Sequence, residues 1–148
     1  MHYETTLQSL PAASRVPGVV TWSCQIGAAA ILAQTLFFKF TYAPETRIIF
    51  AQLGGRPAAT VAGVAELVCA LLLLVPRTAV WGALLSLGVI AGAIGTHLFV
   101  IGIQVVDPET GKGDGGLLFV LALAVAVLST VVLVVRRAEV VSLLRRFH

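Results

Sequence analysis

The stretch GLLFVLALAVAVLSTVVLVV, residues 116–135, runs for twenty residues without a single charge. An α-helix needs about 20 apolar residues to cross the hydrocarbon core of a bilayer. Three further apolar stretches lie at about residues 19–42, 58–75 and 79–103. The sequence therefore predicts an all-α integral membrane protein with four transmembrane helices, whose principal partner is the lipid bilayer.

The composition of the whole chain leads to the same class. Hydrophobic residues make up 58% of the 148 residues and charged residues only 11%. A soluble domain of this size could not bury so much apolar surface. Residues 1–148 are expected to form a single domain. The basic residues flank the apolar spans and are not interleaved with aromatic residues, which excludes a nucleic-acid-binding surface.

The connections between the spans predict an antiparallel, up-and-down four-helix bundle. Residues 76–78 join the second and third spans so closely that these helices must be neighbours. Residues 44–57 include Ile48, Ile49 and Phe50 and read as a short amphipathic turn at the membrane interface. After the fourth span, arginines alternate with apolar residues, which predicts an interfacial basic helix or an extension of that span.

The positions of the cations predict the orientation, because cytoplasmic loops carry an excess of Lys and Arg. One face of the membrane would have Arg15, Arg77, Arg136, Arg137, Arg145 and Arg146, and the other only Arg47, Arg56 and Lys112. We therefore expect a multi-pass protein of the cell's inner (plasma) membrane with both termini in the cytoplasm.

The third span is rich in glycine, including Gly82 and the small-xxx-small pair Gly88 and Gly92. Such residues allow helix backbones to approach closely in lipid. Tight packing within the chain is the favoured interpretation, and a homo-oligomer interface is the alternative. Cys24 and Cys69 lie far apart in apolar spans and are expected to be buried thiols.

Three ionisable side chains, Lys39, Glu66 and His97, lie within the predicted spans. Each costs about 2.5–3.5 kcal/mol to insert into a bilayer, so such residues are usually paired and often functional. With alternating helix directions, their depths coincide near one end of the bundle, where Asp114 precedes the fourth span. Glu66 lies on the face with Ala62, where helices meet, so it must find a partner or stay protonated.

Two interpretations of this group remain open. In the functional one, Glu66 and His97 exchange protons as catalytic residues, and Lys39, Glu66, His97 and Asp114 bind a ligand in a cavity. In the structural one, a Lys39–Glu66 ion pair and a hydrogen-bonded His97 only fix the helix register. No metal site is predicted, because HxxxH and ExxH spacings are absent.

Four segments carry a resemblance to a known family: FFKFTYAPET at residues 37–46, GVAELVCALLLLVPRTAVWGALL at 63–85, AGAIGTHL at 91–98 and GDGGLLFVLAL at 113–123. The chain resembles the DoxX-like family of small four-helix membrane proteins over about residues 35–132. Lys39, Glu66, His97 and Asp114 occur in the order of that family's pattern.

The resemblance implies an association with membrane redox proteins, since relatives are linked to a quinol oxidase, thiosulfate:quinone chemistry and methylamine dehydrogenase maturation. Quinone is the cofactor or ligand that it implies. The chain lacks a cysteine pair for a thiol relay of its own, which favours a component that acts with redox partners over an unaided enzyme.

Three functions follow as alternatives. A quinone-linked redox accessory predicts a cavity open sideways to lipid. A solute- or proton-coupled binding or transport module predicts a path past Glu66, with Gln25 and Gln34 as its deep polar support. A structural partner protein predicts a filled interior. The first is favoured because the polar groups gather at one end.

Overall fold

The computed structural model describes residues 15–146, with side chains described for residues 18–141. Its helical elements are α1 (Arg15–Thr41), α2 (Pro44–Ala51), α3 (Gly55–Leu74), α4 (Ala79–Thr96), the π-helical segment η1 (His97–Ile101), α5 (Leu117–Val135) and α6 (Arg137–Arg146). Within these residues, extended pairing is limited to one isolated bridge between Val106 and Gly113. The described part of the chain is all-helical, as predicted.

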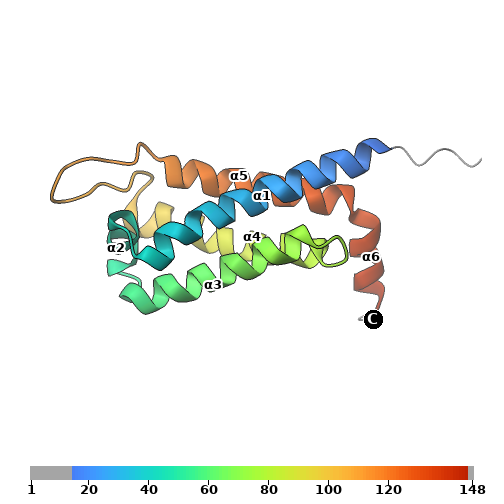
Figure 1. The fold of residues 1–148 in the computed structure, drawn as a ribbon, viewed down its shortest axis with the longest axis horizontal. Coiled ribbons are helices and arrows are strands. Elements are labelled where there is room, and N and C mark those ends of the chain that lie inside the picture. The colour runs from blue at the N-terminus through green and yellow to red at the C-terminus, as the bar shows by residue number, and fades with distance from the viewer. Residues whose placement is uncertain (1–14, 147–148) are drawn as a thin grey trace, which may run out of the picture.

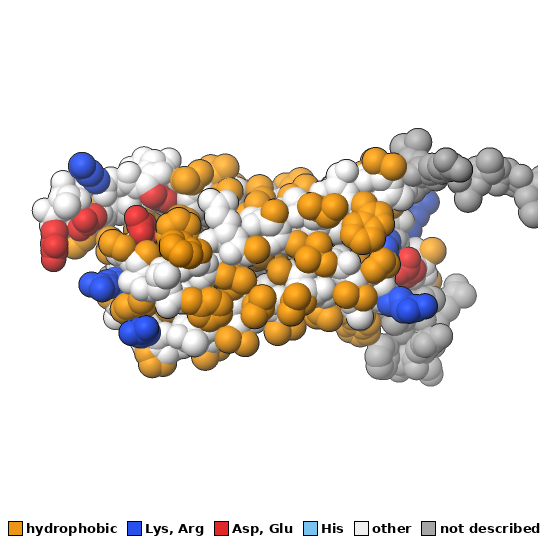
Figure 2. Space-filling model, in the orientation of Figure 1, with side chains coloured by type: hydrophobic (Ala, Val, Ile, Leu, Met, Phe, Trp, Pro, Cys, Tyr) orange, Lys and Arg blue, Asp and Glu red, His pale blue; other side chains and the backbone are white. Residues whose placement is uncertain are grey.

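Four of these helices are long and apolar enough to cross a membrane: Gly18–Thr41, Gly55–Leu74, Ala79–Ile101 and Leu117–Val135. They correspond to the four predicted spans, which indicates a multi-pass membrane protein. Figure 2 shows hydrophobic side chains over the middle of the molecule and charged side chains gathered toward its two ends. This distribution matches an apolar bilayer core between two polar interfaces.

The four long helices lie side by side (Figure 1), and the contacting pairs are α1 with α3, α3 with α4, α4 with α5 and α5 with α1. This cycle of contacts closes a four-helix bundle. Figure 1 shows α2 and the loop before α5 at one end, which we call the cavity end. The α3–α4 connection and α6 lie at the other end, which we call the turn end.

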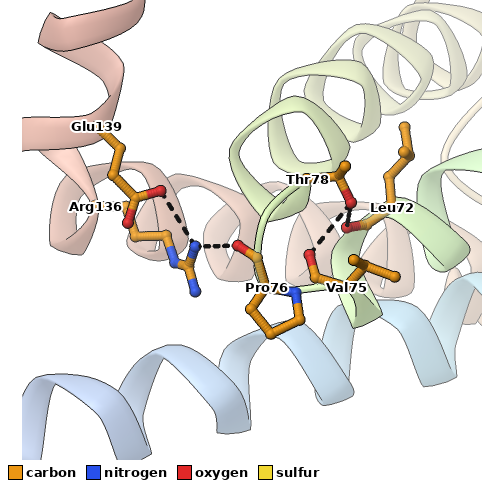
Figure 3. Close-up of polar contacts among 6 residues, drawn as sticks. All are labelled: Leu72, Val75, Pro76, Thr78, Arg136 and Glu139. Atoms are coloured by element: carbon orange, nitrogen blue, oxygen red, sulfur yellow. Dashed lines mark hydrogen bonds and ion pairs between the residues drawn. The ribbon is translucent and has the colours of Figure 1, made fainter.

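The α3–α4 connection at the turn end is held by side-chain hydrogen bonds (Figure 3). The Thr78 hydroxyl lies 3.0 Å from the Leu72 carbonyl oxygen and 3.2 Å from that of Val75. Arg136, which follows α5, donates to the Pro76 carbonyl oxygen and forms an ion pair of 3.3 Å with Glu139 on α6. These contacts fasten the start of α6 to the connection between α3 and α4.

Close packing near the turn end depends on Gly82. A Cβ atom at this position would lie 2.6 Å from the Leu73 backbone nitrogen and 2.8 Å from the Leu72 carbonyl carbon. The expected close approach of helices is therefore present at Gly82. The same expectation is wrong for Gly88 and Gly92, because an added Cβ at either position would meet nothing within 4 Å. Their spacing is right for packing, but their side of α4 does not meet a neighbouring helix there.

The short segments differ in detail from the prediction. Residues 44–57 were expected to form a turn, but they form the helix α2 and the start of α3. Pro44 lies in the first turn of α2 and Pro57 in that of α3, where a missing N–H costs least. After α5, α6 is a separate helix that turns away from the α5 axis (Figure 1). The side chains of Arg15, Arg145 and Arg146 lie outside the described part.

Candidate functional site

A cavity of about 570 Å³ lies at the cavity end of the bundle. Its lining includes all four side chains predicted as site residues: Lys39, Glu66, His97 and Asp114. Most of the remaining lining is apolar and comes from α1, α2, α4 and α5. The cavity therefore has a polar part and long apolar walls.

Glu66 is the most deeply embedded carboxylate of the cavity. Its Oε2 atom lies 2.9 Å from Lys39 Nζ, and the exposed fractions of the two side chains are 6% and 16%. The Thr35 hydroxyl, one turn before Lys39 on α1, is 2.8 Å from the same oxygen and donates to it. Two donors from α1 thus hold the carboxylate of α3. The ion pair that the structural interpretation expected is present, and it lies in the cavity wall.

Small residues allow this pairing. Gly63 lies one turn before Glu66 on the inner face of α3, and a Cβ there would be 3.3 Å from the Phe40 ring and 3.5 Å from Lys39 Cβ. Ala59 and Gly63 are both buried, so α1 and α3 approach closely where the pair forms. Lys39 also lies in the last turn of α1, where a positive charge interacts favourably with the helix dipole.

His97 begins the π-helical segment η1, an element that is frequent at functional sites. Its Nδ1 atom lies 3.0 Å from the Gly102 carbonyl oxygen, and its ring packs edge-on against Phe119 with 5.6 Å between centroids. A carbonyl oxygen only accepts, so we assign the proton of the neutral ring to Nδ1. Nε2 then remains as an acceptor. His97 is 5% exposed and its position is tightly constrained.

Asp114 anchors the loop before α5. Its Oδ1 accepts hydrogen bonds from the backbone N–H groups of Val105 (2.9 Å) and Gly116 (3.0 Å), and its Oδ2 accepts one from Leu118 (3.0 Å). Burial alone would raise the pKa of this carboxyl. The three N–H groups, with His97 nearby, outweigh burial and hold the pKa below its usual range. The carboxylate therefore has a clear structural task in addition to lining the cavity.

Helix α2 forms part of the cavity wall, and sequence reasoning did not assign it to the site. Glu45, Thr46, Ile49 and Phe50 all line the cavity. The Thr46 hydroxyl donates to the Phe38 carbonyl oxygen at 3.0 Å, which ties α2 to the end of α1. The spacing of Thr46, Ile49 and Phe50 could have indicated this helix, because residues three and four apart lie on one helix face.

The backbone at the end of α1 directs α2 toward the cavity. Tyr42 adopts a left-handed conformation with φ 55°, which is rare for a bulky residue. The Ala43 N–H bonds to the Phe38 carbonyl at 3.0 Å and closes the helix end. The guanidinium groups of Arg47 and Arg56 each lie 5.8 Å from the centre of the Tyr42 ring. Two cation–π contacts thus favour this unusual turn.

The cavity presents both hydrogen-bond donors and hydrogen-bond acceptors. Lys39 and Thr35 are donors, whereas Glu66 and His97 Nε2 are acceptors. Among the described residues, no three His, Cys, Asp or Glu side chains group closely enough to hold a metal ion. Comparison with protein-family models, curated proteins and solved structures finds no match.

Proposed function

We propose that this chain is a membrane component of a quinone-linked redox system, and that its cavity binds the head group of a quinone. The observation that supports the proposal is the cavity itself, which combines apolar walls with Lys39, Glu66 and His97. A purely structural protein was expected to have a filled interior, and the cavity does not favour that alternative.

The size and lining of the cavity fit a quinone. Its volume of about 570 Å³ falls in the range of roughly 300–1,000 Å³ that is typical of small-molecule sites. Ile31, Phe38, Phe50 and Leu121 supply apolar surface for a ring and the start of an isoprenoid tail. The Lys39 ammonium has three donors, and those that it does not use on Glu66 can bind a ring carbonyl oxygen. The fit concerns both the size and the polarity of the ligand.

In this proposal the residues of the chain move protons and the quinone supplies the redox chemistry. Glu66 accepts or returns a proton at Oε1, and Lys39 and Thr35 hold the carboxylate in place through Oε2. His97 accepts at Nε2 while the Gly102 carbonyl fixes the orientation of its ring. Asp114 holds the loop that contains Gly102 against the start of α5. In this proposal, electrons would be exchanged with partner redox proteins.

The proposal includes an orientation in the membrane. The four long helices cross the plasma membrane in alternating directions, with both termini in the cytoplasm and the cavity end outside. The support is the excess of cations near the turn end and the termini in the sequence. Helices α2 and α6 would then lie at opposite interfaces. By resemblance, DoxX-like proteins would be a functional parallel.

The test is thermal unfolding of the purified protein in detergent, with and without short-chain ubiquinone and menaquinone analogues, from pH 5 to 9. A ligand at 100 times its dissociation constant stabilises the folded state by about 2.7 kcal/mol. We expect such a shift in the wild type and in Glu109→Gln, an exposed carboxylate outside the cavity. We expect no shift in Glu66→Gln. An unchanged unfolding temperature of the wild type with every quinone would overturn the proposal.

A second pair of variants tests the cavity without altering a charge. Gly92 lines the cavity from an exposed position, and a side chain there would meet open space, so Gly92→Leu should narrow the entrance of the cavity and still fold. Gly88 also faces open space but does not line the cavity, so Gly88→Leu is the matched control. The quinone shift should disappear in Gly92→Leu and persist in Gly88→Leu.

A further inference from the structure

A second group of polar side chains lies deeper in the bundle than the cavity. Gln25 on α1, Ser86 on α4 and Ser129 on α5 are each fully buried, with exposed fractions of 0%. Both polar atoms of the Gln25 amide and both serine hydroxyls have no hydrogen-bond partner among the described residues. The Cys69 thiol of α3 interacts with the Ser86 hydroxyl, but a thiol is only a weak hydrogen-bonding group. We call Gln25, Ser86 and Ser129 the buried polar layer.

The layer lies just beneath the floor of the large cavity. Leu32, Ile90 and Val125 line the cavity and are almost fully buried. Ser86 and Ser129 each lie four residues from Ile90 and Val125, which corresponds to about 6 Å along a helix. Gln25 lies seven residues from Leu32, or about 10 Å by the same rise. The apolar ring of Leu32, Ile90 and Val125 therefore separates the cavity from the layer.

Beyond the layer, a second cavity opens at the turn end. It has a volume of about 280 Å³ and is lined by Thr21, Arg136 and Glu139 among others. Thr21 is buried and lies one turn from Gln25 on α1. Polar groups thus follow one another from Glu66 through the buried polar layer and Thr21 to the second cavity. The ring of three apolar side chains is the principal interruption.

Unpartnered polar atoms in such a position need an explanation. Each buried amide or hydroxyl without a partner destabilises the fold, and no lipid can compensate for it. Buried groups of this kind commonly bind internal water, which makes about three hydrogen bonds. Polar residues within transmembrane helices also mark proton relays. Four such atoms on three neighbouring helices are more than a single structural hydrogen bond requires.

We propose that the buried polar layer is the middle of a water-mediated proton path between the two cavities. A proton leaves the Glu66 carboxyl group for water, passes along water molecules held by the hydroxyl and amide groups of the layer, and reaches water in the turn-end cavity beside Thr21. Each water molecule that takes a proton on one side releases one on the other, so no further reactant is needed. The ring of Leu32, Ile90 and Val125 limits the rate. This inference goes beyond the proposed function, because it requires no quinone.

The test is proton flux into vesicles that contain the purified protein, a pH-sensitive dye inside, and valinomycin with potassium to balance charge. We expect acidification faster than in vesicles without protein, and a fall to that background in Gln25→Leu and in Ser129→Ala. Thr130→Ala, beside Ser129 but on the exposed side of α5, is the matched control and should conduct like the wild type. Val125→Ala should conduct faster.

Folding is checked in the same samples, because replacing an unpartnered polar group by an apolar one is near neutral or stabilising. Wild-type flux equal to that of empty vesicles would overturn the proposal, as would wild-type flux in a folded Gln25→Leu protein. The change of unfolding temperature with quinone is a separate measurement. The proton-path proposal can therefore be refuted while the quinone proposal holds, and the quinone proposal can be refuted while the proton-path proposal holds.

Discussion

At the turn end of the bundle, α3 and α4 meet backbone to backbone at Gly82, and Thr78 and Arg136 tie the connection to its neighbours. At the cavity end, the helices enclose about 570 Å³ and carry the buried ion pair of Lys39 and Glu66. Close packing of small residues thus stabilises one half of the bundle. Charge pairing holds the other half around an open space, which is where a ligand can bind.

The largest effect is expected from leaving Glu66 without its cation. Removing one partner of a buried pair costs about 3–5 kcal/mol, because an uncompensated charge remains. Lys39→Met should therefore lower the free energy of unfolding by about that amount, measured by denaturation in mixed detergent. The double variant Lys39→Met with Glu66→Met should recover most of the loss. If the Lys39→Met protein is as stable as the wild type, the ion pair does not stabilise the cavity end.

A smaller effect is expected at the turn end. Gly82→Ala places a Cβ atom against the backbone of Leu72 and Leu73, which cannot move without shifting a helix. Overpacking of this kind costs about 1–3 kcal/mol. Gly88→Ala, in the same helix but facing open space, is the control and should be neutral or slightly stabilising. The unfolding temperatures of the two variants should differ clearly. Equal values would contradict the account of close packing at this end.

The smallest effect concerns the loop that closes the cavity end. Asp114→Ala removes the acceptor of three backbone N–H groups and should cost about 1–2 kcal/mol. The folded state lowers the pKa of Asp114, so its contribution is present above the unfolded pKa of about 3.9 and is lost as the pH falls through the folded value.

A pH series of unfolding temperatures checks this sign. As the pH falls below about 4, the Asp114→Asn protein should lose less stability than the wild type does. Asp107→Asn is the comparison, because the Glu109 N–H and the Thr110 hydroxyl lower the pKa of Asp107, which does not line the cavity, in the same loop. Its effect on stability should be smaller. If the Asp114→Asn protein loses as much stability in acid as the wild type, groups other than Asp114 cause that loss.

The four spans could be predicted because length and hydropathy are local properties of the sequence. The convergence of Lys39, Glu66 and His97 followed from helix direction and depth alone. The π-helical turn at His97 could not be predicted, since it depends on contacts with Gly102 and Phe119. Sequence spacing also could not show which face of α4 meets a neighbour, so Gly88 and Gly92 were wrongly assigned to packing.

The contribution of α2 and the task of Asp114 were missed for a related reason. Both depend on backbone groups that come together only in the folded chain: the Phe38 carbonyl for Thr46, and the N–H groups of the loop for Asp114. The buried polar layer was visible only as Gln25, because Ser86 and Ser129 look ordinary in apolar helices until their burial is known.

The central claim is that the cavity around Glu66 binds a quinone, and photolabelling with an azido-quinone in membranes tests it most directly. We expect mass spectrometry to locate adducts on cavity-lining residues such as Phe38 and Phe50, and unlabelled quinone or Gly92→Leu to suppress them. Adducts confined to outward-facing positions such as Val61 and Val127, unaffected by competitor, would contradict the claim.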